Sequence, residues 1–139
     1  MSVTRFSFEQ LTVGAADSLS LEVTEETVTG FGRLVKDLNP VHLDEQFAAR
    51  SIFGRRVAHG MLAAGLISAV LGTKLPGPGG IYLSQKLDFK KPVFLGDAIT
   101  ARVEIMEKNA HSGRVRLRTW VENQDGHLVL DGQAEVLVR

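Results

Sequence analysis

An acid and an imidazole flank a proline in the segment that runs from Asp37 through Asn39 and Pro40 to His42. In an uninterrupted helix, side chains five residues apart point about 140° away from each other, because each residue turns about 100°. Proline pushes the residue before it out of the helical region, so a helix is expected to end there. Asp37 at the helix end and His42 on the following loop could then converge on one water as an acid–base pair. The spacing alone leaves open that Asp37 pairs with Lys36 or an amide, and that His42 is a surface residue.

A second feature is the sequence His59-Gly60-Met61 at the start of an apolar stretch. Glycine lets a ligand approach the backbone closely. The first amides of a helix have no internal partner and lie at the positive end of its dipole. The Gly60 amide is therefore a candidate site for a developing oxyanion. The same residues could instead make a tight start to a buried helix, and we expect His59 to order this turn.

Hydrophobic periodicity predicts the elements that must hold these groups. Thr24 followed by Glu25 and Glu26 is typical of a helix N-cap with acids in the first turn. The predicted elements are a half-buried strand over 19–23, helices over 25–38, 44–49 and 60–74, strands over 81–89, 99–105, 115–121 and 133–138, and an Asp-Gly turn at 123–126.

The helix over 60–74 is apolar on most sides, and only alternating strands follow it. A helix without a polar face must be covered almost all round, so one long antiparallel sheet is expected to wrap around it. This predicts an α+β chain with the hot-dog fold. The open edge of such a sheet favours a homodimer in which the sheet continues across two chains.

Composition limits the function classes. The 139 residues carry 16 Lys and Arg against 16 Asp and Glu, so no overall charge attracts nucleic acid or an anionic membrane. The absence of cysteine excludes thiolate nucleophiles and Cys-ligated metal sites. The length suits one domain, 1–139. The longest uncharged stretch, 57–73, is shorter than the roughly 20 residues that span a bilayer, and the N-terminus lacks the features of a secretory signal. We therefore expect a cytoplasmic protein.

The segments around these residues resemble the (R)-specific enoyl-CoA hydratases, the MaoC-like branch of the hot-dog superfamily. The shared motifs are Asp-x-Asn-Pro-x-His at 37–42 and, some seventeen residues further on, His-Gly-Met at 59–61. The likeness continues through 71–79, 82–85 and 92–97. It covers nearly half of the chain, and both motifs are intact.

The resemblance implies reversible syn hydration of a trans-2-enoyl thioester to the (R)-3-hydroxyacyl thioester, without a metal or an organic cofactor. Asp37 and His42 would activate one water and exchange its proton, and the Gly60 amide would stabilise the thioester enolate. The sequence does not assign which of the pair is the base. Three further residues support the motifs: Asn39, Pro40 and His59.

The resemblance also places the acyl chain along Ser68, Leu71 and Val136, although an apolar helix can hold such residues as ordinary core positions. The thioester carrier is coenzyme A or acyl carrier protein, which present the same pantetheine arm. Coenzyme A is strongly anionic, and the cations nearest to the motifs in sequence, each of which could equally be a solvated surface residue, are Arg55, Arg56, Lys86, Lys90 and Lys91.

Three other functions fit these residues less well. A hot-dog thioesterase usually acts through a carboxylate on the central helix, and the segment 57–86 contains no Asp or Glu. A non-catalytic acyl-binding subunit is expected to have lost the acid and the imidazole, and this chain keeps both. A metal site at His42, Asp44 and Glu45 is disfavoured because only one imidazole is local.

Overall fold

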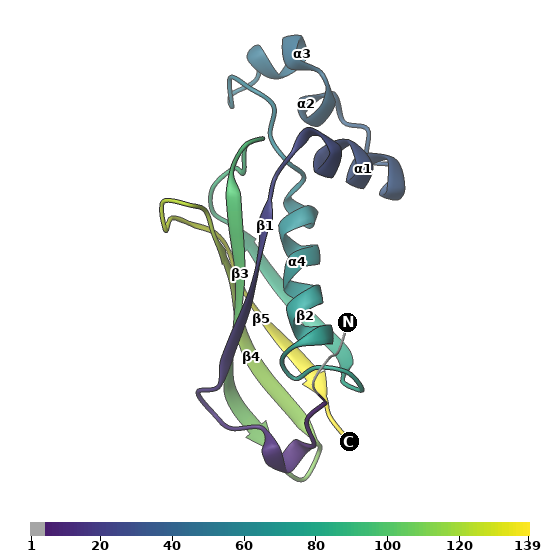
Figure 1. The fold of residues 1–139 in the computed structure, drawn as a ribbon, viewed down its shortest axis with the longest axis vertical. Coiled ribbons are helices and arrows are strands. Elements are labelled where there is room, and N and C mark those ends of the chain that lie inside the picture. The colour runs from purple at the N-terminus through teal and green to yellow at the C-terminus, as the bar shows by residue number, and fades with distance from the viewer. Residues whose placement is uncertain (1–4) are drawn as a thin grey trace.

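A twisted antiparallel sheet is wrapped around one apolar helix in the computed structural model, which describes residues 5–139 (Figure 1). Helices α1 to α3 extend beyond one end of the sheet (Figure 1). In chain order the elements are η1 (Phe8–Gln10), β1 (Ala16–Glu22), α1 (Glu25–Val35), α2 (Pro40–Leu43), α3 (Glu45–Ala49), α4 (Gly60–Thr73), β2 (Ile81–Phe89), β3 (Ala98–Asn109), β4 (Arg114–Glu122) and β5 (Leu128–Leu137).

The five strands lie in the order β1-β3-β4-β5-β2, and each neighbouring pair is antiparallel. Strands β3 and β4 alternate buried and exposed residues because one face of the sheet packs on α4. Strands β1 and β2 are the two edges, and β2 is largely exposed. The expected hot-dog architecture is therefore confirmed.

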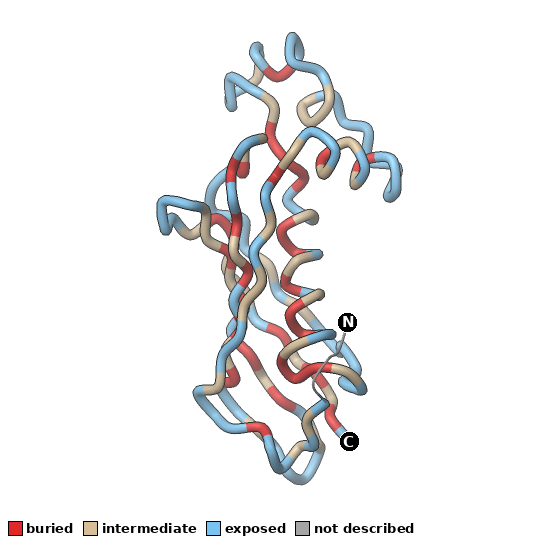
Figure 2. The backbone as a smooth tube through the Cα atoms, viewed as in Figure 1, coloured by how far each residue is buried: buried red, intermediate tan, exposed pale blue. Residues whose placement is uncertain are grey.

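Helix α4 supplies the centre of the core. It contains no charged residue, and Ala63, Ile67, Val70 and Leu71 are buried at the three- and four-residue spacing of one helical face. Figure 2 shows this buried side of α4 turned toward the sheet. Ile67 is fully buried, and covering a side chain of this size contributes about 1.5 to 3 kcal/mol. The packed sheet and α4 thus support the first turn of α4, which begins at Gly60.

The predicted helix over 25–38 is the element that the structure corrects most. It ends at Val35, because Lys36 takes a left-handed conformation with φ of 66°. Pro40 does not stop this helix. It starts the next one, α2, at the first helical position, where a fixed φ suits the helix and no backbone N–H is needed. His42 therefore lies on a short helix and not on a loop.

Most other bounds agree with the sequence to within a few residues. Helix α3 has Asp44 as its N-cap, and α4 begins at Gly60 as expected. Strand β5 starts at Leu128, five residues before the predicted start, and β1 begins at Ala16. Among residues 5–139, none of the helices reaches the length and apolarity that crossing a bilayer requires.

Candidate active site

The link between α1 and α2 bends the chain so that Asp37 and His42 face one another. Lys36 ends α1, and the side chain of Asn39 caps α2 by accepting a hydrogen bond from the Val41 amide at 3.2 Å. The Asn39 amide in turn donates to Oδ1 of Asp37 at 3.3 Å. These local bonds fix the carboxylate relative to the first turn of α2. Asn39 and Pro40 thus shape the bend, although by starting a helix and not by ending one.

A carboxylate oxygen of Asp37 and a ring nitrogen of His42 lie within 4.8 Å of each other. Two hydrogen bonds of about 2.8 Å that meet at a tetrahedral water span roughly 4.6 Å. A separation within this limit is in the range that one bridging water can span. Asp37 is exposed and His42 is half-buried, so the water between them would be reached from solvent.

The His42 ring is held in one tautomer. Its Nδ1 lies 2.7 Å from the carbonyl oxygen of Val57, and because a carbonyl only accepts, Nδ1 must carry the proton. In the neutral ring Nε2 is then the unprotonated nitrogen. Burial is the largest influence on the pKa of His42 and lowers it, and the neighbouring His59 ring lowers it further. The Val57 carbonyl and Asp37 act in the opposite direction, and the net pKa is below the usual value. His42 is thus prepared to accept a proton at Nε2.

Arg56 anchors the backbone of His42, a role that sequence reasoning missed. Its Nε donates to the His42 carbonyl at 2.7 Å, and its guanidinium binds both carboxylate oxygens of Glu25 at 2.7 and 3.1 Å. The hydrogen bond from Arg56 lowers the pKa of the Glu25 carboxyl. The sequence grouped Arg56 with solvated cations, whereas its side chain is only 9% exposed. Glu25 and Arg56 are 31 residues apart, so no local pattern indicates the pair.

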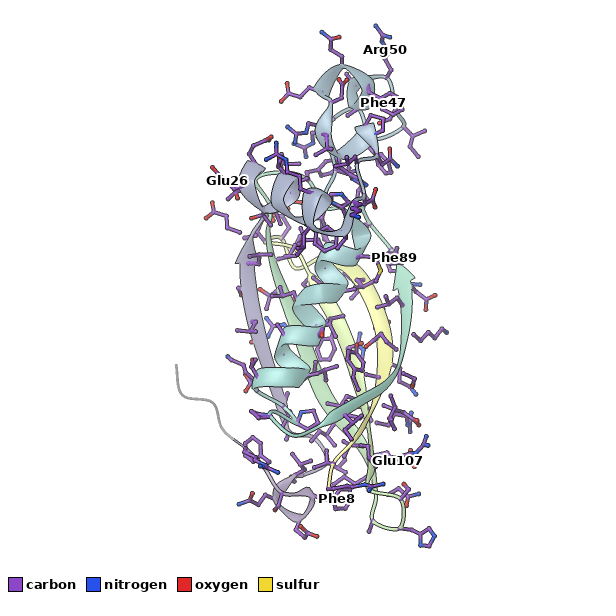
Figure 3. The ribbon with its side chains drawn as sticks, turned by 90° about the vertical axis from the view of Figure 1, so that its right-hand side faces the viewer. Phe8, Glu26, Phe47, Arg50, Phe89 and Glu107 are labelled. Carbon is purple, nitrogen blue, oxygen red and sulfur yellow. The ribbon has the colours of Figure 1, made fainter. Side chains whose placement is uncertain are left out.

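His59 contacts both Asp37 and His42. It is 3% exposed, its Nε2 lies 2.9 Å from the Asp37 carbonyl oxygen, and its ring stacks on His42 with 3.8 Å between centroids. Gly60 follows as the first residue of α4, so its amide has no partner within the helix. A side chain at Gly60 would require the Phe89 ring to move, since its Cε1 would lie 2.6 Å from an added Cβ. Figure 3 shows Phe89 at the end of β2, beside the first turn of α4.

A cleft of about 620 Å³ joins these groups. Asp37, Asn39, His42, His59 and Gly60 line it together. The apolar part of its wall comes from different elements and includes Phe53, Ala63, Phe89, Val93 and Leu130. The cleft thus offers an acid, an imidazole and a helix N-terminus beside an apolar surface, which is the setting that hydration of a conjugated double bond requires.

The predicted acyl-chain residues lie elsewhere in this chain. Ser68 is exposed on α4, and Leu71 is 3% exposed in the core. Val136 on β5 is also buried, and its Cγ1 lies 2.9 Å from where a Cβ on Gly80 would be. None of these three residues lines the cleft that contains Asp37 and His42.

The five cations noted in the sequence divide into engaged and free groups. Arg56 binds Glu25, Lys86 lies 3.6 Å from Asp88, and Arg55 covers the ring of Phe94 at 3.8 Å. The remaining two, Lys90 and Lys91, line the cleft, and neither has an acidic partner within 4.0 Å among residues 5–139.

Three side chains could each offer a metal ligand, because atoms of Asp37, His42 and His59 lie within 4.8 Å of one another. The two imidazole planes are stacked with only 30° between them, however, so their in-plane lone pairs do not converge on one ion. The other set considered from the sequence is His42, Asp44 and Glu45. In the structure the Asp44 carboxylate instead caps α3 by accepting hydrogen bonds from the Gln46 and Phe47 amides. The arrangement suits proton transfer better than metal binding.

The sheet and the central helix define a hot-dog protein, and the acid–imidazole pair lies in a cleft at the first turn of that helix. A solved (R)-hydratase from A. caviae that is involved in polyhydroxyalkanoate (PHA) biosynthesis superposes with a TM-score of 0.91 at 43% identity, covering 94% of this chain and 99% of that one. The MaoC like domain family matches residues 10–125, and the chain belongs to this family.

Two characterised relatives are similar over most of the sequence. A 3-hydroxybutyryl-CoA dehydratase from Methylorubrum extorquens is 49% identical over 131 residues, which are 94% of this chain and 83% of that protein. An (R)-specific enoyl-CoA hydratase from Rhodospirillum rubrum is 44% identical over 131 residues, covering 94% and 90%.

Proposed function

We propose that the chain is a hydro-lyase that interconverts trans-2-enoyl-CoA and (R)-3-hydroxyacyl-CoA by syn addition and removal of water. The observation that carries the proposal is the pairing of Asp37 with His42 across the space of one water, in a cleft that also contains the Gly60 amide. Relatives with this named activity at 44% identity and above support it.

The His42 tautomer supports an order of proton transfers. Water bridges Asp37 and His42, and Nε2 of His42 removes one proton as the water oxygen bonds to C3 of the enoyl group. The π electrons move toward the thioester oxygen, where the Gly60 amide and the dipole of α4 stabilise the enolate. The imidazolium then returns the proton to C2 from the same side. Asp37 accepts a hydrogen bond from the other O–H of the water, which stays on the oxygen as the 3-hydroxyl, and its charge stabilises the imidazolium.

The test is an absorbance assay at the enoyl-thioester band with crotonyl-CoA and longer enoyl-CoA thioesters. Asp37→Ala and His42→Ala should each lower the rate by about 10² to 10⁴ or more, since each removes a positioned proton-transfer group. Asp125→Ala and His111→Ala are matched controls at exposed positions away from the cleft. Wild-type turnover in either cleft variant would overturn the mechanism, and an (S) alcohol on a chiral column would overturn the assignment.

Coenzyme A is proposed as the carrier. Its phosphates need cations, and Lys90 and Lys91, which line the cleft, have no acidic partner within 4.0 Å among residues 5–139. Alanine at both positions should raise KM for crotonyl-CoA while leaving crotonyl-pantetheine, which lacks the phosphates, unchanged. Lys86→Ala is the control, because Lys86 already pairs with Asp88. An equal effect on both substrates contradicts the assignment, and preference for an acyl carrier protein thioester would favour that carrier.

A homodimer that continues the sheet through β2 is part of the proposal. This edge strand is paired on one side only and exposes Ile81, Tyr82 and Leu83. A two-fold axis that passes through this edge perpendicular to the sheet would pair the two β2 strands antiparallel and place both copies of α4 on the same face of the joined sheet, so that the exposed Ser68 faces a second chain. Light scattering should give twice the 15.1 kDa of one chain, and Leu83→Lys should lower that mass.

The proposed dimer also bears on the acyl chain of the substrate. Ser68, Leu71 and Val136 are proposed to bind this chain in a pocket that the second copy of the protein completes. Ser68→Leu should then reduce kcat/KM for longer enoyl-CoA more than for crotonyl-CoA, since the path for the chain narrows. An equal reduction for every chain length would contradict this role. The cytoplasmic location stays a prediction that cell fractionation tests.

A further inference from the structure

His59 occupies the N-cap position of α4 without acting as a cap. Its side chain makes no capping hydrogen bond, although this position normally favours a side chain that accepts one. The ring instead reaches across to the segment between α1 and α2, where it is 3% exposed. A buried polar ring that does not serve its own helix must be explained by what it contacts.

The hydrogen bond to Asp37 fixes the protonation of His59. The Asp37 carbonyl oxygen only accepts, so Nε2 of His59 carries the proton. Nδ1 of His59 is buried and has no hydrogen-bond partner among residues 5–139. A second proton there would be an unsatisfied buried donor, which is costly. The neutral His59 ring is therefore the Nε2–H tautomer.

The His59 ring is also packed on several sides. It stacks on His42 with 3.8 Å between centroids and contacts the ring of Phe31 at 4.9 Å. Gly32 closes a third side, where a Cβ would lie 3.3 Å from Cε1 and Nε2 of His59 and 3.0 Å from the Asp37 carbonyl oxygen. Any movement of His59 must therefore shift His42, Asp37 or α1.

We propose that His59 is the positioning residue of the Asp37–His42 pair, in that its Nε2–H holds the Asp37 backbone and its stacked ring fixes the plane of the His42 imidazole. The inference rests on the proposed hydratase function and deepens it. His59 does not exchange a proton with substrate. It keeps the acid and the imidazole at the separation that one water bridges.

The charges around His42 also bear on the proposed proton transfer. The charged groups nearest His42 are the Asp37 carboxylate, which stabilises an imidazolium, and the Arg56 guanidinium, which binds the His42 carbonyl. A charged His59 in stacking contact would oppose the imidazolium that forms when His42 accepts a proton.

Two substitutions separate the hydrogen bond from the ring. His59→Phe keeps an aromatic ring but loses the donor, whereas His59→Gln keeps an N–H donor near the position of Nε2. We expect kcat for crotonyl-CoA to fall by about 10- to 100-fold in His59→Phe with KM within about twofold, because small misplacement of reacting groups is expensive. His59→Gln should recover most of this loss.

Gly32→Ala tests the same contact without changing any polar group. Its new Cβ presses on His59 and the Asp37 carbonyl, so kcat should fall several-fold while the helix gains stability. Gly30→Ala is the matched control on the same helix, because nothing lies within 4 Å of its Cβ position. Gly30→Ala should keep wild-type kcat.

The results that would contradict the positioning role differ from those that would contradict the hydratase function. His59→Phe with wild-type kcat, or Gly32→Ala indistinguishable from Gly30→Ala, overturns the positioning role while the hydratase function stands. An inactive wild-type chain overturns the hydratase function itself. Nitrogen NMR of the free protein gives a readout apart from activity, since His59 should be in the Nε2–H form and His42 in the Nδ1–H form. A proton on Nδ1 of His59 contradicts the proposal even if every variant folds poorly.

Discussion

The sheet with α4 and the segment α1–α3 are held in place by different forces. Strands β3 and β4 and helix α4 bury row after row of aliphatic side chains, whereas in α1–α3 only Val28, Gly32 and Ala48 are buried (Figure 2). Leu34 and Phe47 of that segment are 81% and 51% exposed. The core is stabilised by apolar burial, and the segment by a few directional bonds.

This difference matters because the site lies on the boundary between the two regions. Gly60 and His59 belong to the well-packed side, while Asp37 and His42 belong to the segment. Arg56 and His59 tie one side to the other through the backbone carbonyls of His42 and Asp37. Stability and activity should therefore respond to different substitutions.

The largest expected effect is on stability. Ile67→Ala opens a cavity in the fully buried centre of α4 and should lower the free energy of unfolding by about 2 to 5 kcal/mol. Leu34→Ala in the segment should change it by less than about 0.5 kcal/mol, because the side chain is already solvated. Urea unfolding measures both, and equal losses would show that the two regions are not held differently.

A smaller effect is expected on activity when Arg56, which links Glu25 of α1 to the His42 carbonyl, is replaced. Arg56→Lys loses the Nε donor to the His42 carbonyl and the two-bond contact between the guanidinium and the Glu25 carboxylate. We therefore expect kcat to fall about tenfold. Glu25→Gln removes only the ion pair and should change kcat by less than about threefold. Steady-state kinetics of both variants decide this, and a larger loss in Glu25→Gln would reverse the roles.

The pH dependence should follow His42. Its pKa is lowered mainly by burial, so the neutral base persists below its usual pKa of about 6.5, and the acid limb of kcat/KM should lie at lower pH than that. The unfolded chain binds the proton more readily than the folded one, so stability is lost as pH falls from about 6.5 to the folded pKa. Urea midpoints at pH 7 and 5.5 should differ less in His42→Gln than in the wild type. An acid limb above pH 6.5 would contradict this assignment.

The smallest effect concerns the end of α1. Lys36 has a φ of 66°, which is strained for any residue with a Cβ. Lys36→Gly should stabilise the chain by about 0.5 to 1 kcal/mol after the greater flexibility of glycine in the unfolded state is counted. Lys36→Ala, which keeps the strain, should leave the urea midpoint nearly unchanged. If both variants behave alike, the left-handed turn is not what ends α1.

Periodicity predicted the core well because burial follows it directly. The apolar helix from Gly60 and the alternating strands at 99–105 and 115–121 lie where the sequence places them. The missed start of β5 has a local cause, since Leu128 to Leu130 form an apolar run and Gly132 interrupts the alternation. The bend at Lys36 carried no signal, because glycine and asparagine are the residues that normally mark a left-handed turn.

The site was predictable in its parts and not in its connections. Asp37, His42 and Gly60 were found from residue types and spacing, and they line one cleft. Arg56 and Phe89 were missed as parts of the site, because their contacts join residues far apart in the chain. His59 was expected only to order a turn, and its stacking on His42 depends on how α1 and α4 pack.

The amino-acid sequence by itself determined the hot-dog architecture and the residues that could exchange a proton, because periodicity and residue chemistry are local properties. Only the tertiary structure decided which ring nitrogen of His42 and which of His59 carries the proton. That choice depends on the carbonyls of Val57 and Asp37, which the packing of distant segments brings within hydrogen-bond distance. A carbonyl can only accept, so the fold sets the direction in which the proton of the site can move.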